Sequence, residues 1–348
     1  MKRIGVIFGG RSGEHEVSLL SAVSVIEAVD KEKYSVVKIG INHDGKWFLF
    51  EGDTEAVADG SWEKTAKPIE AESIGQYIDF ALPILHGTFG EDGCIQGLFE
   101  ILDIPYAGCG VLASSLCMDK AMAKAIFEYR GIPTCKYVLV FAEEVHEDAK
   151  AAAEKVYKEF NGTVFVKPSN MGSSVGISKA RDVAELEVAL EEAAKFDRRI
   201  IVEEAVNGRE IETGVIGNFR PEAGAVGEIK VAADFYDYSA KYSEDKGTVV
   251  QVPAELPKKL AEKVRELAVK AYKAMSCEGF ARVDFFLSND TGELFINEIN
   301  TIPGFTKYSM FPLIWENAGV NFTELIERIV ELGYERYNDK NKRQTVYR

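Results

Sequence analysis

The sequence of 348 residues has few of the features that mark exported, membrane-bound or nucleic-acid-binding proteins. Its five cysteines are an odd number without CxxC spacing, which is typical of free thiols in a reducing compartment rather than of a disulfide framework. No apolar stretch approaches the ~18 residues of a membrane helix, and the run after Arg3 is interrupted at Gly9, too early for a signal peptide. We therefore expect a cytoplasmic protein without a membrane partner.

Positive charge is also scarce. Lys and Arg together number 41 against 56 Asp and Glu, which gives a net charge of −15 and a surface that repels polyanions such as nucleic acids. Any phosphate group would have to be held by local cations and backbone amides. The sequence contains no internal repeat or low-complexity tract, and its 46% hydrophobic and 28% charged residues are near the globular average. Its length exceeds the ~150 residues of one typical domain, so we expect several globular domains.

Strand-like and helical patterns alternate in the first third of the chain, which predicts an open parallel α/β domain. The strand-like runs are Arg3–Phe8, Ser35–Ile41 and Ile78–Leu85, and the helical ones lie around Gln96–Leu102 and Ser114–Tyr129. We expect this domain to span residues 1–121.

Two α+β domains are predicted to follow, over residues 122–208 and 209–348. In the first, two helices accompany the strands Tyr137–Phe141, Thr163–Lys167 and Arg199–Glu203. In the second, helices at Leu260–Met275 and Phe322–Leu332 back a mostly antiparallel sheet of Glu210–Gly217, Ala225–Val231, Phe280–Leu287 and Leu294–Asn300. The fold class is therefore α/β with α+β domains.

The strongest local signal for chemistry is the pair of strands that carries Arg282, Asp284, Glu298 and Asn300. Residues two apart in a strand share a face, so Arg282 lies with Asp284, and Glu298 with Asn300. Hard oxygen donors without His or Cys suit Mg²⁺ or Mn²⁺, whose coordination shell is often completed by nucleotide phosphates. The alternative is a salt-bridged surface hairpin.

A Gly/Ser loop over residues 170–176, which includes Ser173 and Ser174, follows the strand that ends near Lys167. Its amides and hydroxyls could close over phosphates with Lys167 as a point cation. It is not a Walker A motif, because no Gly-Lys-Ser/Thr follows, and an ordinary surface turn is the alternative.

Three further segments allow two readings each. Glu16 begins a helix, where it either complements the helix dipole or holds a substrate ammonium. His86 opens a glycine-rich segment after a strand, which is a turn or a ligand loop. The aromatic segment from Tyr236 to Tyr242 is a loop that either packs on its own domain or acts as a lid.

Taken in order, the motifs resemble the D-alanine:D-alanine ligase family of the ATP-grasp superfamily, from Ile4 to nearly the end of the last predicted helix. The matching segments are Phe8-Gly9-Gly10, His15 to Leu19, His86-Gly87, Gly90 to Gly93, Met118-Asp119-Lys120, Lys167-Pro168-Ser169, Gly172 to Gly176, the loop to Tyr242, Arg282-Val283-Asp284 and Asn297 to Thr306.

The resemblance implies a homodimer of three-domain ATP-grasp chains, with ATP between the second and third sheets and small-molecule substrates between the first and third. In this family one D-alanine carboxylate is phosphorylated by ATP with two Mg²⁺ or Mn²⁺ ions, and the acyl phosphate reacts with a second D-alanine to supply peptidoglycan precursors.

The resemblance also implies a role for each matched residue. The residues expected to contact the nucleotide are Lys120, Lys167, Ser174, Glu203, Glu210 and Lys241. The metal ligands are Asp284, Glu298 and Asn300. Arg282 and the Gly304 backbone stabilise the oxyanion, and Glu16 takes the first ammonium, linked through Ser173 and Tyr242 to the closing loop. Substrate contacts fall to His86, Ser309 and Met310.

Two rivals stay open from the sequence. One is a sister ligase that joins D-alanine to D-serine or D-lactate, although the Lys241-Tyr242 pair argues against the lactate type. The other is a nucleotide-binding regulator without catalysis, against which the complete charged set argues.

Overall fold

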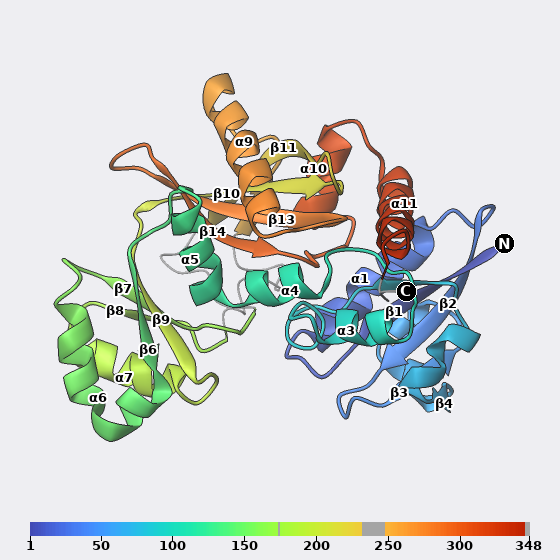
Figure 1. Ribbon diagram of the computed structural model, residues 1–348, viewed down its shortest axis with the longest axis horizontal. Helices are drawn as coiled ribbons and strands as arrows, with labels where there is room; N and C mark the ends of the chain where they lie inside the picture. The colour runs from blue at the N-terminus through green and yellow to red at the C-terminus, as the bar shows by residue number, and fades with distance from the viewer. Residues whose placement is uncertain (173–174, 232–247, 345–348) are drawn as a thin grey trace.

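Three lobes, each with its own sheet, make up the computed structural model, which describes residues 1–172, 175–231 and 248–344 (Figure 1). In the first lobe β1 (Lys2–Gly9) pairs in parallel with β2 (Tyr34–Ile41) and β5 (Phe80–Pro83). Two short antiparallel strands, β3 (Trp47–Phe50) and β4 (Lys67–Ile69), extend the sheet beyond β2. The parallel pairing expected from the sequence is confirmed for β1, β2 and β5, whereas β3 was not expected; residues 42–46 are too few for a parallel crossover, so β3 turns back along β2.

The last helix of the chain packs on this first lobe. Helix α11 (Phe322–Asn341) buries Leu325 and Ile329 in the same core as Val25 of α1 (His15–Ala28), and Figure 1 shows α11 beside the N-terminal sheet. The remaining helical elements of the lobe are α2 (Glu55–Ala58), η1 (Ser61–Lys64), η2 (Ala71–Gln76) and α3 (Cys94–Ile101). The first strand and helix of the chain therefore share one core with its last helix.

The helical pattern expected over Ser114–Tyr129 forms two helices, α4 (Val111–Met118) and α5 (Lys120–Tyr129). Asp119 separates them because its backbone is extended (φ −83°, ψ 100°) and its carboxylate caps α5 by accepting the Met122 N–H at 3.0 Å. This break places Lys120 in the first turn of α5, at the entrance to the central lobe.

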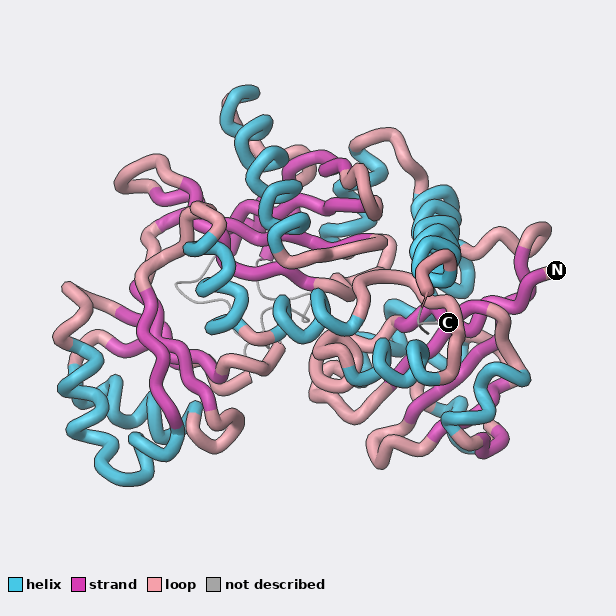
Figure 2. Tube along the Cα trace, in the orientation of Figure 1, coloured by secondary structure: helices cyan, strands magenta, loops and turns pink. Residues whose placement is uncertain are grey.

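The central lobe is a four-stranded antiparallel sheet with two helices on one face, as Figure 2 shows. The strand order is β6 (Tyr137–Phe141), β9 (Arg199–Glu204), β7 (Val164–Pro168) and β8 (Ser178–Ala180). Helices α6 (Ala142–Tyr157) and α7 (Val183–Ala193) bury Ala153 and Leu190 against Val166 and Val202. Alternate residues of β7 and β9, including Lys167 and Glu203, face the other side of this sheet.

The third lobe is a five-stranded antiparallel sheet between two helical layers. Its strand order is β12 (Thr248–Gln251), β11 (Glu222–Val231), β10 (Gly208–Ile216), β13 (Phe280–Ser288) and β14 (Leu294–Asn300). Helix α9 (Lys258–Ala274) covers one face, and α10 (Met310–Asn317) packs on the other. The β13–β14 register sets Arg282 opposite Asn300 and Asp284 opposite Glu298, which brings together the two pairs that the sequence pattern placed on one face of each strand. Within the described ranges, no helix combines the length and apolarity needed to cross a membrane.

Candidate active site

A cavity of about 1750 Å³ lies where the three lobes meet. Every predicted site residue that the structure describes lines it. These residues are Glu16, His86, Lys120, Lys167, Glu203, Glu210, Arg282, Asp284, Glu298, Asn300, Gly304, Ser309 and Met310. The predictions for Ser173, Ser174, Lys241 and Tyr242 lie outside the described residues. The fold thus gathers residues from distant parts of the sequence around one space.

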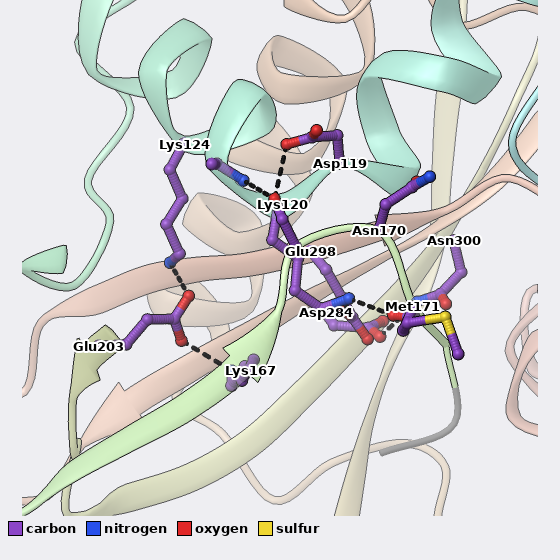
Figure 3. Close-up of polar contacts among 12 residues, drawn as sticks. Asp119, Lys120, Lys124, Lys167, Asn170, Met171, Glu203, Asp284, Glu298 and Asn300 are labelled. Atoms are coloured by element: carbon purple, nitrogen blue, oxygen red, sulfur yellow. Dashed lines mark hydrogen bonds and ion pairs between the residues drawn. The ribbon is translucent and has the colours of Figure 1, made fainter. Parts of the chain in front are cut away.

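On the central-lobe side, Glu203 of β9 lies between two lysines (Figure 3). Lys167 Nζ donates to Glu203 Oε2 at 2.7 Å, and Lys124 Nζ lies 3.2 Å from Glu203 Oε1. Burial disfavours the charged carboxylate, but attraction by both lysines outweighs it and lowers the pKa of Glu203 to about 2. Burial likewise opposes the charge of Lys167, yet the pKa of Lys167 is raised because Glu203 is so close. All three groups are therefore charged at neutral pH.

Lys120 connects the central lobe with the third lobe. Its Nζ donates to the Met171 carbonyl at 2.6 Å and lies 3.8 Å from Glu298 Oε2. The start of α5 is fixed to the base of the Gly/Ser loop, because the Ser169 hydroxyl donates to Asp119 Oδ1 at 2.7 Å and Arg199 pairs with the same carboxylate. Lys120 is thus a cation held between two walls of the cavity, as Figure 3 shows.

On the third-lobe side, Arg282 is surrounded by acidic groups. Its Nε and Nη2 donate to Asp284 Oδ1 and Oδ2 at 2.8 and 2.7 Å, and its Nε also lies 2.9 Å from Glu212 Oε2. Burial opposes the guanidinium charge, but Asp284 and Glu212 outweigh it and raise the pKa of Arg282 well above its ordinary value. Asn300 Nδ2 donates to Asp284 Oδ2 at 2.7 Å, which brings the β13 and β14 groups together.

The donor set on β13 and β14 suits a hard cation. Asp284, Glu298 and Asn300 offer carboxylate and amide oxygens, which are the ligands that Mg²⁺ prefers. Asp284 is shared with Arg282, and among residues 1–172, 175–231 and 248–344 no three His, Cys, Asp or Glu side chains cluster closely enough to enclose a metal. The residues therefore fit an ion that completes its coordination shell with ligand phosphates and water.

The structure places Glu16 differently from its expected role. Its side chain is 69% exposed, and its Oε1 lies 3.4 Å from His43 Nε2 at the rim of the cavity. Glu14, two residues earlier, is buried and also lines the cavity. A Cβ added to Gly87 or Gly172 would lie 2.5 or 2.9 Å from Glu14 Oε2, so these glycines make room for its carboxylate. Glu14, rather than Glu16, faces the Gly/Ser loop.

His86 lies in the wall of the cavity, but both of its ring nitrogens have protein partners. Nδ1 donates to the Ile302 carbonyl at 3.0 Å, so Nε2 is the acceptor for the Ser21 hydroxyl at 2.9 Å. Burial lowers the pKa of His86, although Glu14 attracts the charged form. A neutral His86 therefore ties the loop before Gly304 to the first lobe, and its expected contact with substrate stays a prediction.

The end of the cavity near α10 is formed by Gly304, Ser309 and Met310. Ser309 Oγ accepts the Thr306 N–H at 3.1 Å, which closes a tight turn over residues 306–309, and a Cβ added to Gly304 would lie 3.0 Å from the same Oγ. Met310 is buried against Gly227 of β11, where an added Cβ would lie only 2.2 Å from the Met310 sulfur. Small residues thus shape this end of the site.

Sequence reasoning assigned no role to Glu14, Glu212 or Lys124, which lie at or beside the site. Glu212 is two residues after Glu210 on β10, and Lys124 is four residues after Lys120 on α5, so strand and helix periodicity could have placed both near the site. Glu14 could not be distinguished from Glu16 by residue type. The backbone turn before α1, in which Glu14 is the N-cap residue, decides which carboxylate points inward.

Comparisons with known proteins agree with this geometry. Residues 3–109 match the family model described as "D-ala D-ala ligase N-terminus", and residues 126–331 match "D-ala D-ala ligase C-terminus". The D-alanine–D-alanine ligase of Acetivibrio thermocellus is 46% identical over 98% of both chains. That of Clostridium acetobutylicum is 44% identical over 97% of this chain and 99% of the relative.

Solved structures give the same result. The VanG D-Ala:D-Ser ligase from Enterococcus faecalis has a TM-score of 0.86 and 36% identity over 95% of this chain and 99% of that one. The D-alanine–D-alanine ligase from Coxiella burnetii has a TM-score of 0.85 and 32% identity over 98% of both chains. Because the two family models together span most of the sequence, the chain belongs to the D-alanine–D-alanine ligase family, with its ATP-grasp fold.

Proposed function

We propose that this protein uses ATP to join two D-alanine molecules into D-alanyl-D-alanine for peptidoglycan precursor synthesis. The observation that carries the proposal is the single cavity in which Lys120, Lys167 and Arg282 from three different elements face Asp284 and Glu298. Cations of this kind suit a polyphosphate, and the paired carboxylates suit the divalent ions that accompany it. Membership of the family supports the same reaction.

The chemistry requires two transfers. A carboxylate oxygen of the first D-alanine attacks the γ-phosphorus of ATP, the bond from that phosphorus to the bridging oxygen of ADP breaks, and D-alanyl phosphate forms. The amine of the second D-alanine then attacks the acyl carbon, loses a proton and expels phosphate. Positioning and charge stabilisation dominate both steps. We assign phosphate contacts to Lys120 and Lys167, and the oxyanion to Arg282 and the Gly304 N–H.

We infer that Glu14 binds the ammonium group of the first D-alanine. It is buried at the cavity wall beside the Gly/Ser loop, whereas Glu16 lies at the rim beside His43. A desolvated carboxylate discriminates more strongly for an ammonium than an exposed one does. The roles predicted for Ser173 and Tyr242 in closing the loop are proposed to involve Glu14 in place of Glu16.

We further propose two Mg²⁺ or Mn²⁺ ions held by Asp284, Glu298 and Asn300. When bound, such ions offset charge on the transferred phosphoryl group. The protein's part is to hold these oxygens on adjacent strands, with Arg282 holding the Asp284 carboxylate in place through two hydrogen bonds. Glu203, Glu210, Ser174 and Lys241 are assigned to the nucleotide, and Ser309 and Met310 to the second D-alanine.

Phosphate release with ATP, Mg²⁺ and either D-alanine, D-serine, D-lactate or L-alanine tests the function. We expect release with D-alanine, and mass spectrometry should identify the dipeptide. ATP binding without phosphate release under any condition would indicate a regulator and contradict the proposal.

A D-alanine:D-serine ligase is the second candidate, favoured by the likeness to VanG. The two activities differ at the second substrate, where Met310 and Ser309 shape the pocket. One additional hydroxyl group gives weak discrimination in such a pocket. Competition between D-alanine and D-serine at equal concentration, with the products separated by mass, distinguishes the two candidates.

We propose that the chain forms homodimers, has domains over residues 1–121, 122–208 and 209–348, and works in the cytoplasm. The five thiols, all free in the structure, support a reducing location. Light scattering on the eluting protein tests the dimer, limited proteolysis tests the boundaries, and cell fractionation tests the location.

A further inference from the structure

Lys124 is a buried cation that the proposed reaction leaves without a role. It is 0% exposed and, unlike Lys167 and Glu203, it does not line the cavity. Its Nζ lies 2.8 Å from Thr134 Oγ1, 3.3 Å from Cys135 Sγ and 3.2 Å from Glu203 Oε1. These contacts surround the ammonium with protein atoms, so Lys124 cannot reach a ligand directly.

Lys167 has a different position on the other side of the same carboxylate. It is 8% exposed, lines the cavity and donates to Glu203 Oε2 at 2.7 Å. Glu203 therefore has one cation that lines the cavity and one that does not, and Figure 3 shows both lysines in contact with its carboxylate. A single lysine would have been enough to neutralise one carboxylate, and a second buried ammonium adds a desolvation cost.

We propose that Lys124 is a positioning residue that keeps Glu203 fixed and compensated, so that Lys167 can leave Glu203 for the phosphates of a bound nucleotide. The inference rests on the proposed ATP-dependent function. Without Lys124, movement of Lys167 toward a phosphate would leave a buried carboxylate with no cation, which is strongly unfavourable. Lys167 would then stay on Glu203, and the protein would lose affinity for phosphates while its contacts to the nucleoside persisted.

The test compares two probes that differ in their phosphates. The dissociation constants of Mg²⁺·AMP-PNP and of adenosine are measured by calorimetry for wild type, Lys124→Met and Lys124→Met/Glu203→Gln. Lys150→Met, on the exposed surface of α6, is the control for loss of one lysine charge. We expect Lys124→Met to weaken AMP-PNP about tenfold or more relative to adenosine, because close charge pairs couple at this level. Lys150→Met should leave the ratio of the two constants unchanged.

The double variant separates this role from a purely structural one. The neutral amide that Glu203→Gln introduces cannot hold Lys167 as a carboxylate does, so the ratio should return to within about threefold of wild type. This variant also removes the unbalanced buried charge, and it decides the question if Lys124→Met does not fold. The inference would be overturned if Lys124→Met weakened the binding of AMP-PNP and of adenosine equally. It would also be overturned if the double variant kept the altered ratio of the two dissociation constants. A wild-type protein that bound no AMP-PNP would instead overturn the proposed function, and the inference with it.

Discussion

Two charged clusters beside the cavity have opposite charge balances. On the central-lobe wall two lysines, Lys124 and Lys167, surround the single carboxylate of Glu203. On the third-lobe wall the single guanidinium of Arg282 lies among three carboxylates, those of Glu212, Asp284 and Glu298. The cluster around Glu203, called the positive wall below, has an excess of positive charge, and the cluster around Arg282, called the negative wall, has an excess of negative charge.

This difference shows how an acidic protein can hold a polyanion. The positive wall can attract phosphates directly, whereas the negative wall would repel them unless divalent cations lie between. Lys120 links the two sides, since its Nζ donates to the Met171 carbonyl and lies 3.8 Å from Glu298 Oε2, as Figure 3 shows. Phosphate affinity should therefore depend on lysines at one wall and on metal ions at the other.

The largest expected effect comes from neutralising the negative wall. Glu298→Gln removes a charged oxygen donor from the proposed metal site, and we expect the rate of phosphate release to fall about a thousandfold. A Mg²⁺-dependent phosphate-release assay measures it, with circular dichroism to confirm the fold. Glu293→Gln, in the exposed turn of the same hairpin, is the matched control. Near-normal turnover of Glu298→Gln at ordinary Mg²⁺ would contradict the metal assignment.

A pair of matched variants tests which carboxylate at the start of α1 meets the substrate. Glu14→Gln should lower kcat/KM for D-alanine about a hundredfold, because a buried charged contact to the ammonium is lost. Glu16→Gln should change it by less than about threefold, because an exposed charge pair contributes little. Initial rates over a range of D-alanine concentrations measure both. The reverse order of effects would restore the original assignment to Glu16.

The positive wall should affect how the free energy of unfolding changes as the pH falls. The pKa of Glu203 is lowered from 4.5 to about 2 in the folded protein, so its contribution is present above about pH 4.5 and is lost as the pH falls toward 2. The full difference is worth up to about 3 kcal/mol. Urea unfolding between pH 7 and 3 should show a shallower loss of stability in Glu203→Gln than in wild type, with Glu204→Gln as control. Superimposable slopes for wild type and Glu203→Gln would rule out this linkage.

The sequence predicted well those elements that local hydrophobic patterns determine, and poorly those that depend on single contacts or on residues far along the chain. Strong hydrophobic patterns located β6 and β14 at their observed bounds. The break at Asp119 and the short strands β3, β4 and β8 were missed, because they depend on one capping contact or on edge pairing rather than on periodicity. The packing of α11 on the first lobe could not be read from α11 alone, since an apolar stripe on a helix does not specify which core buries it.

The site residues were predicted best where the regular geometry of a strand determines the direction of each side chain. Alternation in a strand placed Asp284 on the same face as Arg282, and Glu298 on the same face as Asn300, and the register then showed which residues lie opposite one another. Local geometry failed at Glu14 and Glu16, where a turn sets the direction of each side chain, and at Lys124, whose partner Glu203 is far along the chain. The resemblance of the motifs pointed to the start of α1, but it did not distinguish Glu14 from Glu16.

The smallest expected effect lies away from both walls, at the end of the cavity near α10. Gly227→Ala would place a Cβ 2.2 Å from the Met310 sulfur, so the flexible methionine must shift into the space proposed for the second substrate. Neither charged wall is touched, so the KM for ATP should stay constant. The KM for D-alanine at the second subsite should rise about fivefold, and the D-serine to D-alanine product ratio should fall, because the bulkier substrate is excluded more. Product ratios in a competition assay measure the second effect. A change in the KM for ATP, with the product ratio unaltered, would show that this end of the cavity is coupled to the charged walls rather than to substrate choice.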